Sequence, residues 1–374
     1  MSSSRFQPHL MIVIHSLSGG GAERVAADLS AYWVRRGYRV TLVTQADAST
    51  DVYALHNAVK RYALGTATFS KGKISAILSN LRRVWTLRRL IKRERPTIVL
   101  GMMTTASILA ILAARGQSCR VIATEHTHPP SQDLPDMWSR LRRWAYPQAS
   151  AVVALTSGTA AWLEQHVPGA HVTVIPNAVR WPLENDEPLV VPPAREGRYR
   201  LLAAGRLHPH KGFDLLIKAF QAIAGHFPEW DLIILGEGDS REALQDQIDA
   251  AGLASRISMP GRVGNVGEWY AQSDLYVLSS RVEGLSNTLL EAMASGLAPV
   301  AFDCETGPRE IVRNGIDGVL VNPPEDDEAL AAHLSDMMAH RQQREAYARR
   351  ATDVRDRFST TRVMALWGHL FEAS

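Results

Sequence analysis

Residues 274–291 read DLYVLSSRVEGLSNTLLE, and this stretch indicates how the second half of the chain folds. Its apolar opening predicts a buried strand, and its apolar end predicts a helix that stops at Gly296. Glu283 therefore lies in a strand-to-helix loop at the carboxyl end of a strand, where open α/β sheets bind ligands. Gly284 allows a ligand close to the backbone, the following N–H groups favour an anion, and Glu291 comes two helical turns later. This arrangement suits a nucleotide-sugar, and the alternative is a surface loop with two solvated acids.

A second segment, residues 200–212, repeats this pattern with cations in place of carboxylates. The apolar run LLAA predicts a strand, and Arg206 and Lys211 lie in the loop between it and a predicted helix. A planar guanidinium and a compact ammonium suit phosphate oxygens. Two fixed cations can stabilise the charge on a departing diphosphate without a metal ion.

Taken together, the two segments resemble the donor half of a retaining glycosyltransferase of family 4, which has the GT-B architecture. Further segments that resemble this family are residues 19–24 (GGGAER), 123–126 (ATEH), 174–179 (VIPNAV), 235–238 (LGEG) and 259–263 (MPGRV). The loop of residues 303–310 resembles the variant found in bacterial polysaccharide and lipid-linked oligosaccharide transferases. Leu285 and Ser286 depart from the aromatic-plus-glycine pair of many members.

The domain organisation follows from the alternation of predicted strands and helices, which favours parallel sheets built from βαβ units. The resemblance implies two Rossmann-like doubly wound α/β domains that face each other across a cleft. We expect an acceptor-side domain over 1–180, a proline-rich linker over 181–198 and a nucleotide-sugar-binding domain over 199–358. A terminal helix at about 359–374 would cross back onto the first domain.

The resemblance also implies roles for individual residues. The predicted catalytic residues are Glu283, His126, Arg206 and Lys211. The residues predicted to bind the nucleotide-sugar are Gly20, Gly21, Arg206, Lys211, Gly236, Arg262, Val263, Glu283, Gly284, Leu285, Ser286 and Glu291. Glu23 and Arg24 are expected near the acceptor, although a purely structural turn at the Gly-rich loop stays open.

Composition favours a cytoplasmic protein. Two cysteines are too few for a disulfide framework or a zinc site, and the N-terminus shows no signal-peptide pattern. The pairs His126/His128 and His208/His210 lack a third ligand nearby, so no metal is predicted. We expect no cofactor other than the UDP-sugar that serves as donor.

Charge is distributed unevenly along the chain. Residues 1–180 carry 22 Lys and Arg against 9 Asp and Glu, a net charge of +13, whereas the remainder carries 19 against 29, a net charge of −10. The basic residues concentrate in one amphipathic segment that contains Lys71, Lys73, Arg82, Arg83, Arg88, Arg89, Lys92, Arg93 and Arg95. This asymmetry predicts an anionic partner for the first half.

The same segment has apolar residues at helical spacing, namely Ile74, Ile77, Leu78, Leu81, Trp85 and Ile91. We expect this stripe to pack on the first sheet while Arg82, Arg83, Arg89 and Arg93 meet an anionic membrane or a lipid-linked phosphate. A second cluster, residues 138–144, mixes arginine with tryptophan, as interfacial segments do. A merely solvated basic face is the alternative, and no motif supports nucleic acid as partner.

The sequence therefore predicts a retaining, metal-independent glycosyltransferase of the bacterial cell envelope, peripheral at the inner face of the membrane. It would move a hexose or N-acetylhexosamine from a UDP-sugar to a membrane-associated, lipid-linked glycan acceptor. Two alternatives remain open: a nucleotide-sugar epimerase or hydrolase on the same fold, and a non-catalytic protein that binds a nucleotide-sugar.

Overall fold

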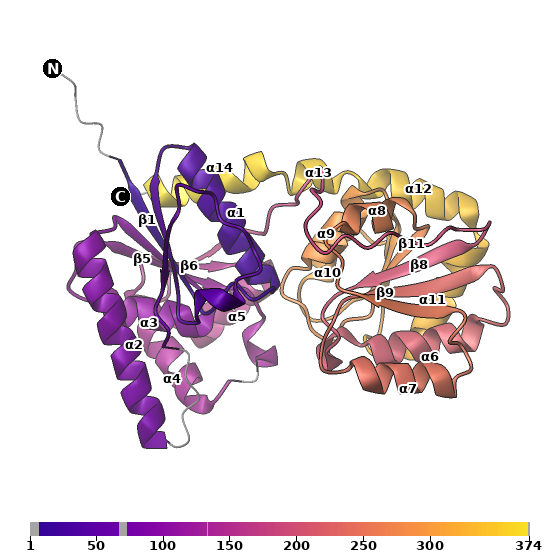
Figure 1. Cartoon of the computed structure of the whole chain (residues 1–374), viewed down its shortest axis with the longest axis horizontal. Coiled ribbons are helices and arrows are strands. Elements are labelled where there is room, and N and C mark those ends of the chain that lie inside the picture. The colour runs from indigo at the N-terminus through magenta and orange to yellow at the C-terminus, as the bar shows by residue number, and fades with distance from the viewer. Residues whose placement is uncertain (1–6, 67–72, 133, 373–374) are drawn as a thin grey trace. The chain divides into compact units, whose positions relative to one another are not determined.

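The computed structural model describes residues 7–66, 73–132 and 134–372, and the side chains of residues 73–77 are outside that description (Figure 1). Its internal contacts divide the chain into two units. The first ends at Ile175 and includes the chain from Leu370 on, and the second runs from Pro176 to His369. No helix or strand occurs within residues 175–198, all of which are described. The domain limits and linker inferred from the sequence stay predictions.

The first unit is built on a seven-stranded sheet in the order β3-β2-β1-β4-β5-β6-β7, with all neighbours parallel. The strands are β1 (His9–Ile14), β2 (Arg39–Thr44), β3 (Lys60–Ala63), β4 (Ile98–Met102), β5 (Arg120–Glu125), β6 (Ala151–Ala154) and β7 (Val172–Val174). All six residues of β1 are buried, as expected of a central parallel strand covered on both faces.

The first unit's helices are α1 (Gly21–Arg35), α2 (Lys73–Glu94), α3 (Thr104–Ala114), α4 (Asp136–Ala145) and α5 (Ser157–His166). Short 3₁₀ turns lie at η1 (Ala48–Thr50), η2 (Pro129–Ser131) and η3 (Tyr146–Gln148). Helix α3 packs against α2, α4 and the strands β4 and β5. Apolar residues of α2, α3 and the strands form one core cluster beneath these helices.

The second unit has a six-stranded sheet in the order β10-β9-β8-β11-β12-β13, again parallel. Its strands are β8 (Tyr199–Ala204), β9 (Trp230–Leu235), β10 (Ile257–Gly261), β11 (Leu275–Leu278), β12 (Pro299–Phe302) and β13 (Val319–Val321). Its helices are α6 (Phe213–Ile223), α7 (Arg241–Ala250), α8 (Val266–Ala271), α9 (Asn287–Ala294), α10 (Pro308–Ile311), α11 (Asp327–Ala339), α12 (Arg341–Ala351) and α13 (Val354–Arg357), with a 3₁₀ turn η4 (Pro209–Lys211). The core of this unit joins α6, α7 and α11 to the sheet.

The terminal helix α14 (Thr360–Glu372) ends in the first unit. The ring of Phe371 lies 4.9 Å from that of Trp33 on α1. Arg120 donates hydrogen bonds of 3.0 Å to the carbonyls of Leu370 and Phe371, which satisfies acceptors that the helix end leaves open. The helix predicted at the C-terminus is therefore present.

Each sheet contains one point where the strand order reverses, between β1 and β4 in the first unit and between β8 and β11 in the second. In open parallel sheets, ligands bind beyond the carboxyl ends of the strands at such a point. The prediction of two parallel, doubly wound α/β sheets is confirmed. Among the described residues, no helix combines the length and apolar character needed to cross a bilayer.

Candidate functional site

The two charged loops of the second half lie at the reversal point of the second sheet. Strand β8 pairs directly with β11, with Leu201 opposite Leu275. The loop of residues 205–212 leaves the carboxyl end of β8, and the loop that contains Glu283 leaves the carboxyl end of β11. The fold therefore brings together two segments that are about seventy residues apart in the sequence.

Glu283 and Lys211 form an ion pair at this point. Lys211 Nζ donates to Glu283 Oε1 at 2.6 Å, and Ser280 Oγ donates to the same oxygen at 2.7 Å. Glu283 is only 8% exposed, so these two donors replace the hydrogen bonds that water would otherwise give its carboxylate. Thr306 Oγ1 donates to the backbone carbonyl of Glu283 at 2.7 Å and fixes the loop from the other side.

Sequence reasoning missed Ser280 and Thr306. Ser280 stands just past the end of β11, three residues before Glu283, so the rule that selected Glu283 could also have found it. Thr306 comes from the loop after β12, 23 residues away, and no local pattern indicates its contact.

The other two cations predicted to bind the donor lie near the same carboxyl edge of the sheet. Arg206 and Arg262 are exposed, and neither guanidinium forms a hydrogen bond or an ion pair with another described residue. Val263 is half-buried beside Arg262. Gly236 has φ of +139°, and a Cβ there would lie 1.8 Å from the carbonyl oxygen of Gly205. Gly236 is therefore required by close packing of two backbones, whether or not a ligand approaches it.

The loop before helix α9, and the helix itself, contain the remaining predicted nucleotide contacts of the second unit. Ser286 is its N-cap and accepts from the backbone N–H of Leu289 at 3.4 Å, which satisfies a donor at the helix start. Leu285 is buried with 6% exposure and belongs to the core, whereas Gly284 is half-buried. Glu291 is 3% exposed on the inner side of the helix.

Tyr276 on β11 lies close enough to Glu283 and Glu291 for their charges to act on its hydroxyl. Its hydroxyl donates to Thr288 Oγ1 at 2.9 Å. Burial raises the pKa of Tyr276, and the charges of Glu283 and Glu291 raise it further. The phenol therefore stays protonated and supports this region as a hydrogen-bond donor.

In the first unit, the Gly-rich loop connects β1 to α1. Gly20 is the N-cap of α1 and Gly21 its first residue. The carboxylate of Glu23 folds back toward Gly20, and Ser16 Oγ donates to Glu23 Oε1 at 3.4 Å. Arg24 is half-buried in the first turn. Glu23 thus lies at the start of the helix, where a negative charge is stabilised.

Glu125, at the end of β5, has a buried carboxylate that contacts four polar side chains. Its oxygens accept from Thr104 Oγ1 at 2.8 and 3.0 Å, from Gln132 Nε2 at 3.0 Å and from the hydroxyl of Tyr146. Arg142 lies 3.5 Å away and is itself only 4% exposed. Arg142 belongs to the cluster interpreted as interfacial, so one of those arginines neutralises an internal acid and does not face solvent.

His126 follows directly on this anchored carboxylate. Its Nε2 atom is buried, and no described residue forms a hydrogen bond with it. Burial lowers the pKa of His126 from 6.5 to about 4. The imidazole is therefore neutral at physiological pH, and one of its nitrogens can bond to a further group.

The structure corrects the interpretation of helix α2. Of the apolar stripe that was expected to pack on the sheet, Ile91 is buried, but Leu78, Leu81 and Trp85 are 61, 60 and 53% exposed. The physical reason is length: 22 residues span about 33 Å, whereas a five-residue strand such as β4 spans about 17 Å. The C-terminal half of α2 covers the sheet, and the N-terminal half extends beyond it (Figure 1). Lys71 and the side chains of Lys73, Ile74 and Ile77 lie outside the part of the chain that the structure describes.

We call the exposed side of this helix the α2 outer face. It consists of Leu78, Leu81, Arg82, Trp85, Arg89, Lys92 and Arg93, all exposed. The guanidinium of Arg89 stacks 3.2 Å from the centre of the Trp85 ring. Arg83 lies to one side, half-buried, and donates to the carbonyl of Thr66 at 2.9 Å.

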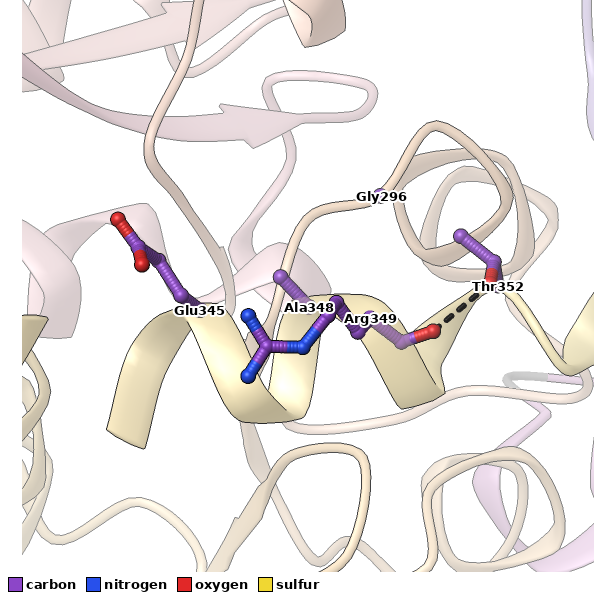
Figure 2. Close-up of a pocket in the computed structure, with 5 residues that line it drawn as sticks. All are labelled: Gly296, Glu345, Ala348, Arg349 and Thr352. Carbon is purple, nitrogen blue, oxygen red and sulfur yellow. Dashed lines mark hydrogen bonds between the residues drawn. The ribbon is translucent and has the colours of Figure 1, made fainter. Parts of the chain in front are cut away.

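A surface pocket occurs elsewhere in the second unit, between Gly296 and helix α12 (Figure 2). It is lined by Gly296, Glu345, Ala348, Arg349 and Thr352. Two of its polar side chains bond within the protein: Glu345 pairs with Arg341 at 2.7 Å, and Thr352 Oγ1 donates to the carbonyl of Arg349 at 2.8 Å. None of the predicted site residues lines it.

Comparisons with known proteins agree with this organisation. Residues 19–180 match the family model described as Glycosyltransferase Family 4, and residues 186–354 match that of Glycosyl transferases group 1. The amylovoran biosynthesis glycosyltransferase AmsD of Erwinia amylovora is 27% identical over 347 residues, 91% of this chain and 93% of that protein.

Two further relatives and one solved structure extend the comparison. A Campylobacter jejuni α-1,4-N-acetyl-D-galactosaminyltransferase, whose name specifies a PP-undecaprenol-linked glycan, is 26% identical over 326 residues, 87% of each chain. An exopolysaccharide phosphotransferase of Streptomyces coelicolor is 33% identical over 273 residues, but these cover 72% of this chain and only 28% of that protein. Anabaena HepE in complex with UDP and glucose has the same fold, with a TM-score of 0.78, 18% identity and coverage of 97 and 99%. The chain therefore belongs to the family 4 glycosyltransferases of GT-B architecture.

Proposed function

We propose that this glycosyltransferase moves a hexose or N-acetylhexosamine from a UDP-sugar to a lipid-linked glycan, with retention of configuration and without a metal ion. The observation that carries the proposal is the Lys211–Glu283 pair, joined at 2.6 Å at the reversal point of the second sheet. The bond that breaks joins a phosphate oxygen to an anomeric carbon. At this position the cation can stabilise negative charge on the phosphate oxygen, and the carboxylate can stabilise positive charge on the anomeric carbon.

In the reaction, the bond between the anomeric carbon and the phosphate oxygen breaks, and its electron pair leaves with the diphosphate. Lys211 and the exposed Arg206 would stabilise the charge that develops on that diphosphate. Glu283 would stabilise positive charge at the anomeric carbon. The acceptor oxygen bonds to that carbon from the face that the phosphate leaves, and its proton passes to the departing phosphate oxygen.

The diphosphate donor has further support in the second unit. Glu291 is buried on α9 behind Glu283 and would accept hydrogen bonds from ribose hydroxyls. The HepE structure with UDP and glucose has this fold, which favours a uridine nucleotide as the donor. Leu285 packs in the core and Ser286 caps helix α9. We therefore propose that these two residues shape the donor pocket and do not contribute charge to it.

A glycan acceptor carried by a lipid is favoured by two relatives. AmsD is named for the biosynthesis of a polysaccharide, and the Campylobacter enzyme for a glycan on undecaprenyl diphosphate. We propose the same acceptor class here, which requires an enzyme that reaches a membrane surface.

The α2 outer face supports that membrane partner. It presents the exposed apolar residues Leu78, Leu81 and Trp85 toward the N-terminal end of the helix and basic residues along the rest. Basic groups bind anionic head groups, and an exposed tryptophan suits the boundary between head groups and acyl chains. Glu94, the one acid of this helix, pairs with Lys60 at 3.0 Å and with Arg93 at 3.2 Å, so Arg82, Arg89 and Lys92 keep the face positive. We therefore propose that the enzyme is peripheral at an anionic membrane.

The proposal is tested by following one reaction with a defined acceptor. Nucleotide-sugars are first screened for the one that raises the melting temperature most, since a ligand that binds only the folded state stabilises it. The product made from that donor and an undecaprenyl-diphosphate-linked glycan is then examined by NMR. We expect the donor's anomeric configuration in the product and full turnover in excess EDTA.

Other outcomes distinguish the remaining alternatives. An inverted product, or a loss of activity that added metal reverses, contradicts the mechanism. Release of free sugar without transfer to any acceptor identifies a hydrolase, a changed donor stereocentre identifies an epimerase, and binding without turnover identifies a non-catalytic protein.

A further inference from the structure

Arg281, two residues before Glu283, makes an unusual set of contacts across three loops of the second sheet. It donates two hydrogen bonds to the carboxylate of Asp214 in the first turn of α6, at 2.7 and 2.8 Å. It also donates to Glu325 Oε2 at 2.9 Å and to the carbonyl of Pro209 at 2.7 Å. One side chain thus joins the loops that follow β8, β11 and β13.

The backbone beside Arg281 is joined to the same loop. The N–H of Arg281 donates to the carbonyl of His210 at 2.8 Å, and Ser279 Oγ donates to the carbonyl of Lys211 at 2.9 Å. Gly212 has φ of +61°, and a Cβ there would lie 2.0 Å from the carbonyl oxygen of Ser279. The backbone carbonyls of Pro209, His210 and Lys211 therefore all accept hydrogen bonds from Ser279 or Arg281, in the segment that leads to Glu283.

These contacts leave Arg281 little capacity to bind a ligand directly. Four of the donor positions of its guanidinium are used by protein acceptors, and two carboxylates oppose its single charge. The neighbouring Lys211 has a long, flexible stem, which loses rotamer freedom when its ammonium is held in one place. A fixed backbone beneath Lys211 lowers the cost of placing that ammonium beside Glu283.

We propose that Arg281 is a positioning residue for the transfer reaction, which holds the loop of Lys211 in register with Glu283. The inference rests on the proposed function, because it takes Lys211 as a group that contacts the donor diphosphate. Stabilisation of a charge that develops during reaction depends on groups that are already in place, so a shift of the loop lowers turnover even though Arg281 touches no substrate.

The test is a double-mutant cycle between Arg281→Ala and Lys211→Ala, with turnover and UDP affinity measured for all four proteins. We expect Arg281→Ala to lower turnover by about tenfold with Lys211 present, and by less than about twofold in the Lys211→Ala background. Arg281→Lys should recover part of the loss, because an ammonium keeps one contact with Asp214 but lacks the planar fork. Asp214→Asn weakens the contact of Arg281 with α6 from the other side, and its effect on turnover should depend on Lys211 in the same way.

Arg198→Ala is the matched control. Arg198 makes a similar set of contacts, two hydrogen bonds to Asp231 and one to the carbonyl of Pro228, at the opposite end of β8. Arg198→Ala should lower the melting temperature as much as Arg281→Ala does and leave turnover near that of the wild type. Asp214→Asn and Arg281→Lys keep the cycle informative if Arg281→Ala does not fold.

The outcomes separate this inference from the proposed function. If Arg281→Ala has equal effects with and without Lys211, or no effect with it, the positioning role is wrong while the donor site stands. If Lys211→Ala itself leaves turnover and UDP affinity unchanged, the proposed donor site is wrong, and the positioning role is wrong with it.

Discussion

In the second unit, Lys211 and Arg281 near the carboxyl edge of the sheet are paired with carboxylates, whereas Arg82, Arg89 and Lys92 of the α2 outer face in the first unit face solvent. Lys211 pairs with Glu283 and Arg281 with both Asp214 and Glu325. On α2, Arg82 and Lys92 form no hydrogen bond or ion pair with any described residue, and Arg89 contacts the exposed ring of Trp85.

Under the proposed function, these similar residues serve two purposes. A cation held by a carboxylate has a fixed position and can stabilise a developing charge at one place. A cation in solvent attracts any anionic surface, and salt weakens that attraction. The following predictions test this comparison, beginning with the largest expected effect.

Removal of the two cations in the loop of residues 205–212 should have the largest effect. We expect Lys211→Ala and Arg206→Ala each to lower turnover by roughly 10²-fold or more, because each removes charge stabilisation for the leaving diphosphate. Lys218→Ala, an exposed lysine on α6, is the control and should leave turnover unchanged. Turnover near the wild-type level in both loop variants would mean that the loop does not hold the diphosphate.

Removal of the solvent-facing cations should weaken membrane binding and leave the donor site intact. The triple change Arg82→Gln, Arg89→Gln and Lys92→Gln should reduce binding to anionic liposomes by up to about a hundredfold, since each charge contributes about 1 kcal/mol at best. Added salt should weaken wild-type binding in the same direction. UDP affinity should not change.

The control for that triple variant removes the same charge from the second unit. Lys218, Arg341 and Arg349 are exposed there, and their replacement by Gln lowers the net charge equally. If both triple variants bind liposomes alike, overall charge and not the α2 outer face decides binding.

The apolar part of the α2 outer face should contribute a smaller, salt-resistant share. Trp85→Ser removes an exposed ring and also the surface on which Arg89 stacks. We expect liposome binding at high salt to fall by roughly tenfold, because burial of apolar area does not depend on screening. Trp181→Ser, an exposed tryptophan of the second unit, is the control. An unchanged affinity at high salt would show that Trp85 stays outside the bilayer.

His126 should produce the smallest effect, a change in the pH dependence of stability. Burial lowers its folded-state pKa from 6.5 to about 4, so the unfolded chain takes up a proton at a higher pH than the folded one does. The stability associated with neutral His126 is therefore complete above pH 6.5 and is lost as the pH falls toward about 4.

His126→Asn should accordingly reduce the drop in melting temperature over this pH range by a few degrees, roughly. The exposed His171 of the same unit provides the control variant, His171→Asn. Equal slopes for wild type and His126→Asn would show that His126 is accessible to protons in the folded protein. The predicted contact of His126 with the donor sugar stays a prediction.

The sequence predicted much of the fold because strand and helix patterns are local. The apolar run at residues 274–280 contains the whole of β11, and the helix expected after Glu283 is α9, which ends two residues before Gly296. The placement of Glu283 and Lys211 in loops followed from these elements. The interpretation of α2 was wrong for Leu78, Leu81 and Trp85, because periodicity shows that a helix has an apolar stripe but not how far the sheet beneath it extends.

The sequence by itself determined which segments become strands and helices, and which loops carry cations, carboxylates and glycines, since these depend on neighbours in the chain. Only the tertiary structure decided that β8 lies beside β11, and so that Lys211 meets Glu283 across 72 positions. It also decided that Arg281 links three loops and that Leu78, Leu81 and Trp85 of α2 remain uncovered. These features depend on strand order and element length in three dimensions, which no local pattern of residues contains.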